Sequence, residues 1–186
     1  MDVDRFRRVR RLVVPAALAM VGALCVPASP VAGATSSPGT SATVTSPATQ
    51  LAAPVIGLTA TPSGRGYWRA ARDGGVLTAG DAPFFGSATR YVHTSVVGIA
   101  STPTGGGYWL VDTAGDVFTF GHAPFRGSMG GQPLNKPIDG IVSFGNGYLM
   151  VASDGGVFDF SNKPFLGSLG GHALSAPIIG IVGFSI

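Results

Sequence analysis

The chain has 186 residues, a formal net charge of +3, 29 glycines, 14 prolines and one cysteine. The charge excess lies entirely in residues 1–34. The remainder carries seven basic residues, seven aspartates and no glutamate, so it is neutral and offers no electrostatic basis for binding nucleic acid. The one cysteine is Cys25, so residues 35–186 contain no disulfide, and we expect packing and backbone hydrogen bonds to stabilise the fold.

Residues 1–34 have the pattern of a secretory signal peptide. Five arginines precede the uncharged stretch 12–26, and Ala32-Gly33-Ala34 fits the motif that signal peptidase cuts. The apolar stretch is shorter than the roughly 20 residues that cross a bilayer, which favours cleavage over retention as an uncleaved anchor. Export by the twin-arginine route stays open beside the general route. We therefore expect a secreted or cell-wall-associated protein without a stable membrane span after cleavage.

Residues 35–53 predict a disordered linker. They are rich in Ser, Thr, Pro and Ala, and residues 35–50 alone hold nine Ser or Thr and two Pro. Such a composition has too little apolar surface to bury. The segment is interpreted as a passive tether, with O-glycosylation as the alternative.

From Pro54 onward the chain repeats itself with a period near 40 residues. Residues 55–95 (repeat 1) and 96–136 (repeat 2) align without a gap, and 17 of 41 positions are identical. Repeat 3 covers 137–176, and a partial fourth repeat covers 177–186. A fixed period of this length is the mark of a repeat architecture, so residues 54–186 are predicted to form one repeat domain.

Each repeat reads as strands separated by turns. An apolar run closed by proline predicts the first strand, a glycine turn follows, and a second strand begins at the Tyr-Trp pair. An Asp-Gly type turn leads to a third strand, and the segment APFRGS (123–128) bends at Pro124 and predicts a short fourth strand. The second strand is apolar on both faces, as in YWLV (108–111), so it needs cover on both sides. Four-stranded sheets stacked on similar sheets, as in propeller blades, provide that cover.

The stretches GYWLVDTAGDVFTFGHAPFRGSMGG (107–131) and GYLMVASDGGVFDFSNKPFLGSLGG (147–171) resemble a known repeat. It has the form GYWLV-x-x-DGGVF-x-F-G-x-A-x-F-x-GS and occurs in tandem in secreted actinobacterial proteins, often beside cell-wall hydrolases. The repeat is similar in style to tectonin-like β-propeller blades. The resemblance covers residues 54–186 and implies an all-β, propeller-like module with a binding role; it does not specify a ligand.

The repeat count predicts an open array. Closed propellers have about four to eight blades, whereas this chain has about three repeats plus one extra first strand. A three-fold β-trefoil is disfavoured because Pro54, Ser95, Pro137 and Pro177 introduce four first strands. The array could be completed by a second chain, or the chain could be a shortened relative of longer proteins. A final strand without a neighbour is a free edge that invites pairing.

The histidines do not form a metal-binding pattern. His93, His122 and His172 fall at three different positions of the repeat, and no ligand spacing typical of zinc is present. Asp112 and Asp116 could hold a cation between two carboxylates, but the stretch lacks the full calcium-loop pattern. We expect no metal and no cofactor.

The recurring serines are interpreted as turn residues. Ser87, Ser128 and Ser168 stand in F-x-G-S, without a neighbouring base or the strained elbow that a nucleophile requires. A serine that caps a turn explains the recurrence better. We expect that the protein is not an enzyme.

The recurring aromatic residues are the candidate binding residues: Tyr67, Trp68, Tyr108, Trp109 and Tyr148. Aromatic faces stack on sugar rings, but packing between sheets is the ordinary alternative. Our leading hypothesis is a secreted, non-catalytic binding module for a cell-surface polysaccharide or a protein partner. The alternatives are a structural fragment that self-assembles into a homo-oligomer through its open strand edge, and an accessory module of a cell-wall enzyme system.

Overall fold

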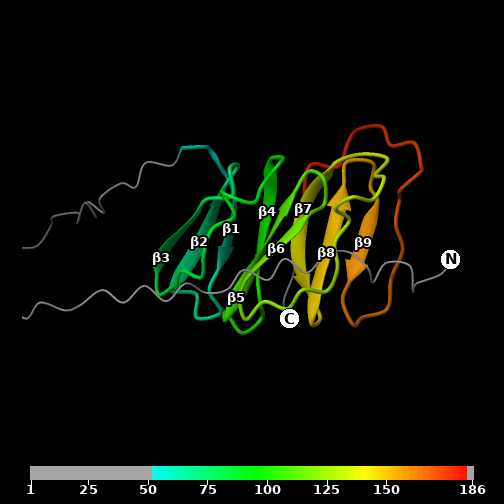
Figure 1. Cartoon of the computed structure of the whole chain (residues 1–186). Coiled ribbons are helices and arrows are strands. Elements are labelled where there is room, and N and C mark those ends of the chain that lie inside the picture. Colours follow the sequence, from blue (N-terminus) through cyan, green and yellow to red (C-terminus); the bar gives the residue numbers. More distant parts are fainter. Residues whose placement is uncertain (1–51, 184–186) are drawn as a thin grey trace, which may run out of the picture. The chain divides into compact units, whose positions relative to one another are not determined.

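The computed structural model describes residues 52–183 and shows an all-β protein, with nine strands and no helix in that range (Figure 1). None of the described segments forms a helix that could cross a bilayer. The predicted signal peptide (1–34), nearly all of the predicted linker (35–53) and residues 184–186 lie outside the described residues.

The strands form three antiparallel sheets, one from each repeat. Within each sheet the strands follow one another in chain order. The strands are β1 (Val55–Ala60), β2 (Gly66–Ala71), β3 (Val76–Gly80), β4 (Val96–Ser101), β5 (Gly107–Asp112), β6 (Val117–Gly121), β7 (Ile138–Phe144), β8 (Gly147–Ala152) and β9 (Val157–Phe160).

Each sheet has three strands, and the predicted fourth strand is not formed in the described residues. The segment after the third strand instead turns back towards its own sheet. Pro83 has no amide hydrogen to donate to a ladder, and its carbonyl accepts a hydrogen bond from Nε1 of Trp68 at 2.7 Å. Ala88 then donates its amide to the carbonyl of Gly74, at the turn between β2 and β3. The backbone carbonyl of Pro83 and the backbone amide of Ala88, which a fourth strand would pair in a ladder, are thus bonded to a side chain and to a turn instead.

The first strands of successive repeats pack against each other through glycine. A Cβ atom at Gly98 of β4 would lie only 3.0 Å from Cγ2 of Ile141 in β7, and 3.0 Å from its backbone nitrogen. A Cβ atom at Gly57 would lie 3.3 Å from Cγ2 of Ile99, and one at Gly140 would lie 3.1 Å from Cγ2 of Ile181. The glycine of each first strand is therefore required by the close approach of the next.

Backbone hydrogen bonds also connect the repeats in series. The carbonyl of Arg72 accepts the amide of Val96 at 2.9 Å, and the carbonyl of Ser153 accepts the amide of Ile178 at the same distance. Residues 178–183 thus begin where a fourth first strand would begin. They form no strand ladder, because no second strand lies beside them in the described residues.

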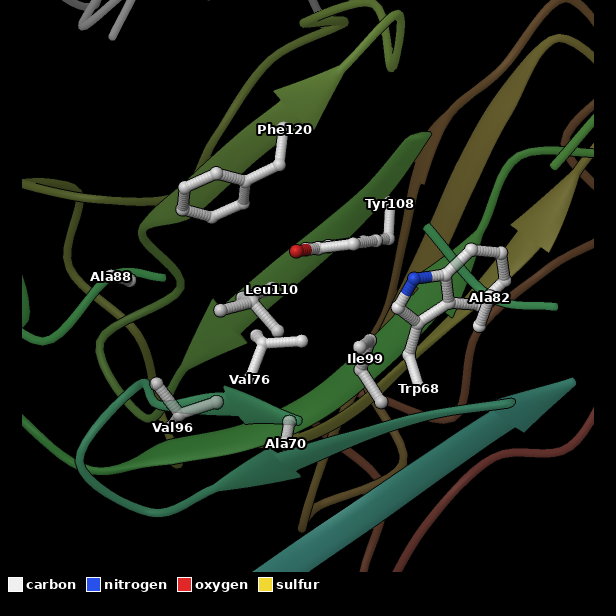
Figure 2. Packing of buried hydrophobic residues seen from close by; sticks show 10 residues of the cluster. All are labelled: Trp68, Ala70, Val76, Ala82, Ala88, Val96, Ile99, Tyr108, Leu110 and Phe120. Atoms are coloured by element: carbon white, nitrogen blue, oxygen red, sulfur yellow. The ribbon is translucent and has the colours of Figure 1, made fainter. Parts of the chain in front are cut away.

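The hydrophobic core consists of two clusters, one at each junction between sheets. At the first junction, Trp68 and Ala70 of β2 face Tyr108 and Leu110 of β5 (Figure 2). Every residue of β5 is buried, which confirms that this strand needs cover on both faces. The three sheets do not close into a ring, so within the described residues the first and third sheets each have one face without a neighbouring sheet.

Candidate functional site

Two of the recurring tyrosines connect neighbouring repeats. The hydroxyl of Tyr108 in repeat 2 donates to the carbonyl of Gly86 in repeat 1 at 2.6 Å and accepts the amide of Phe85 at 3.3 Å. Tyr148 of repeat 3 makes the same contact one junction later, donating to the carbonyl of Gly127 at 2.5 Å. Burial raises the pKa of both phenols to about 12. The tyrosine of one repeat therefore holds the F-x-G-S turn of the repeat before it.

The recurring tryptophans face the opposite way, towards the next repeat. The Trp68 ring lies 5.8 Å from the Tyr108 ring, and Trp109 lies 5.2 Å from Tyr148, measured between centroids. Nε1 of Trp109 donates to the carbonyl of Pro124 at 2.8 Å, as Trp68 does in repeat 1. At each junction, therefore, a tryptophan of one repeat packs against a tyrosine of the next.

Only one of the five predicted binding aromatics is open to a ligand in this arrangement. Trp68, Tyr108, Trp109 and Tyr148 are at most 1% exposed. Tyr67 is 37% exposed, and the guanidinium of Arg69 lies 5.7 Å from its ring centroid. A sugar ring needs access to an aromatic face, so stacking by Tyr67 stays a prediction, whereas the other four rings are covered by protein.

The recurring serines bind turn backbone, which confirms the turn-capping interpretation. Ser128 donates to the carbonyl of Gly115 at 3.0 Å and accepts the amide of Gly130 at 2.9 Å. Ser87 and Ser168 accept the amide of the first residue of the third strand in their own repeats, both at 2.9 Å. These hydroxyls stabilise the hairpin turn rather than stand beside a base.

The Asp-Gly turns also take the predicted form. Asp73 accepts the amide of Gly75 at 3.0 Å, and Gly74 between them has φ = 83°. Asp154 does the same in repeat 3. A positive φ favours glycine because it lacks Cβ.

Repeat 2 has a different turn, with two carboxylates close together. Oδ1 of Asp112 accepts the amides of Ala114 and Asp116, while its buried Oδ2 has no hydrogen-bond partner in the described residues. Burial raises the pKa of Asp116, the Asp112 carboxylate raises it further, and His93 acts in the opposite direction. Within residues 52–183, no three His, Cys, Asp or Glu side chains gather as metal ligands would. Asp112 shapes the turn through the two amides that its Oδ1 accepts.

A shallow depression of about 220 Å³, lined by both polar and apolar residues, lies at the edge of the first junction. Asp81 accepts hydrogen bonds from the hydroxyls of Ser63 at 2.6 Å and Thr61 at 3.0 Å. Nε of Arg65 lies 3.8 Å from Oδ2 of Asp81. The hydrogen bond from Ser63 is the main cause that lowers the pKa of Asp81. Thr104, from repeat 2, contributes a further hydroxyl to the lining.

The sequence contains a signal for this depression that lies outside the motifs described above. The equivalent position just after the third strand is polar in all three repeats: Asp81, His122 and Asn162. In repeat 3 the same position also contacts the glycine turn, since Oδ1 of Asn162 accepts the amide of Asn146. The other histidines lie elsewhere, and Nδ1 of His172 contacts the carbonyl of Leu169.

The two outer faces of the array expose apolar residues. On the N-terminal face, formed by repeat 1, Leu58 is 59% exposed, whereas the equivalent Ile99 and Ile141 are at most 7% exposed. On the C-terminal face, formed by repeat 3, Leu169 is 52% exposed, whereas the equivalent Met129 is 6% exposed. Both faces therefore present positions that the internal junctions bury.

Comparison with known protein families and with curated proteins finds no match for this chain.

Proposed function

We propose that the protein is a secreted, non-catalytic module whose propeller-like blades bind a protein partner through the outer faces of the array. The observation that carries this proposal is the exposure of Leu58 and Leu169 at positions that are buried wherever a neighbouring repeat covers them. Clustered apolar side chains on a surface are typical of protein interaction sites. Each blade here is a three-stranded sheet, and its neighbour provides the cover that the outer faces lack.

The polar groups of the repeat support a non-catalytic role. The hydroxyl of Ser128 is bonded to turn backbone, and so is one oxygen of Asp112. The hydroxyls of Tyr108 and Tyr148 are bonded to the backbone of the preceding repeat. A nucleophile or a general acid needs a free reactive atom within reach of a substrate. In residues 52–183 these recurring groups are instead used to hold turns.

A protein partner fits the exposed faces better than a polysaccharide does. Recognition of sugar by stacking requires open aromatic faces, and of the five candidate aromatics in the described residues Tyr67 alone offers part of its surface. The depression around Asp81 and Ser63 favours an oligosaccharide as the second candidate, because carboxylates and hydroxyls bind sugar hydroxyls. The two candidates use different parts of the molecule and can be separated by mutation.

The test compares binding of the processed chain, which we expect to begin at Thr35, to surface proteins and to protein-free wall polysaccharide. Leu58→Asp and Leu169→Asp place a charge on the two outer faces, and Phe84→Asp is the matched control because Phe84 is 60% exposed in repeat 1. We expect a purified protein partner to bind wild type and Phe84→Asp alike and to lose at least about 10-fold in affinity for an outer-face variant. Polysaccharide binding that resists both outer-face changes but is lost in Asp81→Asn would refute the proposal and support the second candidate.

A further inference from the structure

The N-terminal face presents a tyrosine, Tyr67, that holds no F-x-G-S turn in residues 52–183. Tyr67 is 37% exposed, while Tyr108 and Tyr148 are fully buried at the same position of the repeat. The hydroxyls of Tyr108 and Tyr148 each contact the turn of the preceding repeat, whereas the Tyr67 hydroxyl has no hydrogen-bond partner in residues 52–183. Val55, on β1, is likewise 46% exposed, although Val96 and Ile138 at the same position are buried.

The C-terminal face presents the complementary feature, an F-x-G-S turn to which no tyrosine of residues 52–183 is bound. The carbonyls of Gly86 and Gly127 accept a tyrosine hydroxyl, and Gly167 is the equivalent residue of repeat 3. Leu166, beside it, is 88% exposed. Leu149 takes the position of the junction tryptophans Trp68 and Trp109 and is partly exposed.

Charge on the two faces is also complementary. Arg69 follows Tyr67 by two residues on β2, so both lie on the N-terminal face. Asp159 pairs with Leu149 across β8 and β9, so both lie on the C-terminal face. One face thus carries a cation and the other an anion, which favours contact between the two faces over contact of either face with itself.

We propose that the partner is a second copy of this chain, bound head to tail, with Tyr67 of one molecule against the 165–169 turn of the next. This inference rests on the proposed function, since it identifies the protein that covers the outer faces. The hydroxyl of Tyr67 donates to the carbonyl of Gly167, and its ring packs on Leu149 and Leu166. The contact repeats the geometry of the two internal junctions, in which the same residue positions already meet.

The intermolecular junction has room for one first strand. Residues 178–183 already lie against β7 through Ile181 and Gly140, in the place that the first strand of the next repeat occupies. In the assembled state this segment takes the place of β1 beside β2 of the incoming molecule. The β1 strand is the one to leave, because Val55 and Leu58 are exposed on it. Leu58 then leaves the N-terminal face with β1, and Ile181 takes the equivalent position at the junction. A ladder between residues 178–183 and β2 then replaces the ladder between β1 and β2. Because the two ladders are equivalent, the net gain of the exchange is the apolar surface buried at the new junction.

A head-to-tail contact joins two different faces, so it produces either a closed ring or a filament. Two chains with three sheets each supply six sheets, a number within the range of about four to eight blades seen in closed propellers. The same contact continued without closure gives a filament. Both products require every contact to contain one N-terminal and one C-terminal face.

The experiment is sedimentation velocity of the processed chain over a range of about 1 to 100 μM, where contacts of ordinary affinity become populated. We expect association in wild type and in the control Phe84→Asp. Tyr67→Asp and Leu166→Asp should each sediment as monomers, and Tyr67→Phe should weaken association about 3- to 10-fold through loss of one hydrogen bond. A mixture of Tyr67→Asp and Leu166→Asp should form a 1:1 complex, because one intact contact remains between the two variants.

A disulfide tests the strand exchange. Val55 and Ala71 are register partners in β1 and β2, so the double variant Val55→Cys, Ala71→Cys can lock β1 in place. We expect the oxidised variant to stay monomeric and the reduced variant to associate. Wild type that is monomeric at every concentration, or a mixture of the two aspartate variants that forms no complex, overturns the inference. If such a monomer still binds a different protein through Leu58 or Leu169, the proposed function stands while the second copy is excluded.

Discussion

Removal of the Tyr148 hydroxyl tests the idea that tyrosines hold the repeats together. In Tyr148→Phe, the carbonyl of Gly127 loses a donor at 2.5 Å, and the amides of Arg126 and Gly127 lose an acceptor at 3.2 and 3.1 Å. The phenol is fully buried, so water replaces these partners only in part. Leaving such groups without partners costs about 1–3 kcal/mol of unfolding free energy, which corresponds to a fall in Tm of about 4–12 °C for a domain of this size.

The chain contains its own control for this experiment. Tyr67 occupies the same position in repeat 1, but its hydroxyl has no partner in the described residues, so Tyr67→Phe should change stability by less than about 0.5 kcal/mol in dilute solution. Tyr108→Phe, at the other junction, should behave like Tyr148→Phe, and the two losses should be nearly additive.

The assay is equilibrium unfolding in urea, followed by tryptophan fluorescence, at a concentration below any self-association. Trp68 lies at the first junction and Trp109 at the second, so the fluorescence signal reports the loss of both junctions. If Tyr148→Phe were as stable as wild type, or if Tyr67→Phe lost as much as Tyr148→Phe, the proposed tyrosine contact would not be what stabilises the junctions.

Three further predictions concern the junction tyrosines, the glycines of the first strands and the buried Ser128. Because burial raises the pKa of the two junction tyrosines to about 12, the folded chain holds their protons more tightly than the unfolded chain does. The unfolding free energy, measured in urea between pH 9 and 12, should be constant up to about pH 10 and then fall by up to about 1.4 kcal/mol per pH unit for each tyrosine. If wild type lost no more stability over this range than the double variant Tyr108→Phe, Tyr148→Phe, this prediction would be contradicted. Gly98→Ala places a Cβ 3.0 Å from Ile141 and should lower stability by about 1–3 kcal/mol, whereas Gly180→Ala, at the equivalent position with nothing within 4 Å, should be neutral in thermal unfolding. Ser128→Ala should cost about 1–3 kcal/mol because its buried hydroxyl makes two hydrogen bonds; a loss no larger than that of Ser168→Ala, where the serine is exposed, would argue against it.

The all-β class and the turns were accessible from the sequence because they depend on local chemistry. The turn at Asp73-Gly74 needs a glycine with positive φ and a carboxylate two residues before an amide, and both requirements are visible in the letters. The serine of F-x-G-S caps a turn within its own repeat, so its role could also be predicted from its recurrence.

The fourth strand could not be excluded from the sequence. Whether the segment after Gly80 continues a sheet depends on Nε1 of Trp68 reaching the carbonyl of Pro83, which is 15 residues away in the chain. The role of the aromatics was equally inaccessible, because Tyr67 and Tyr108 are the same residue in the same motif. They differ in whether a preceding repeat covers them.

Sequence alone therefore determined the period, the first three strands of each repeat and the turns, since each is decided by residues a few positions apart and by backbone conformations that only glycine or proline favours. The tertiary structure alone decided which equivalent residues are covered and which are exposed, because burial depends on the neighbouring sheet and not on the residue itself. Leu58 and Ile99 have the same place in the repeat and similar side chains, yet the first is on the surface and the second is in the core. That difference is what directs attention to the two outer faces.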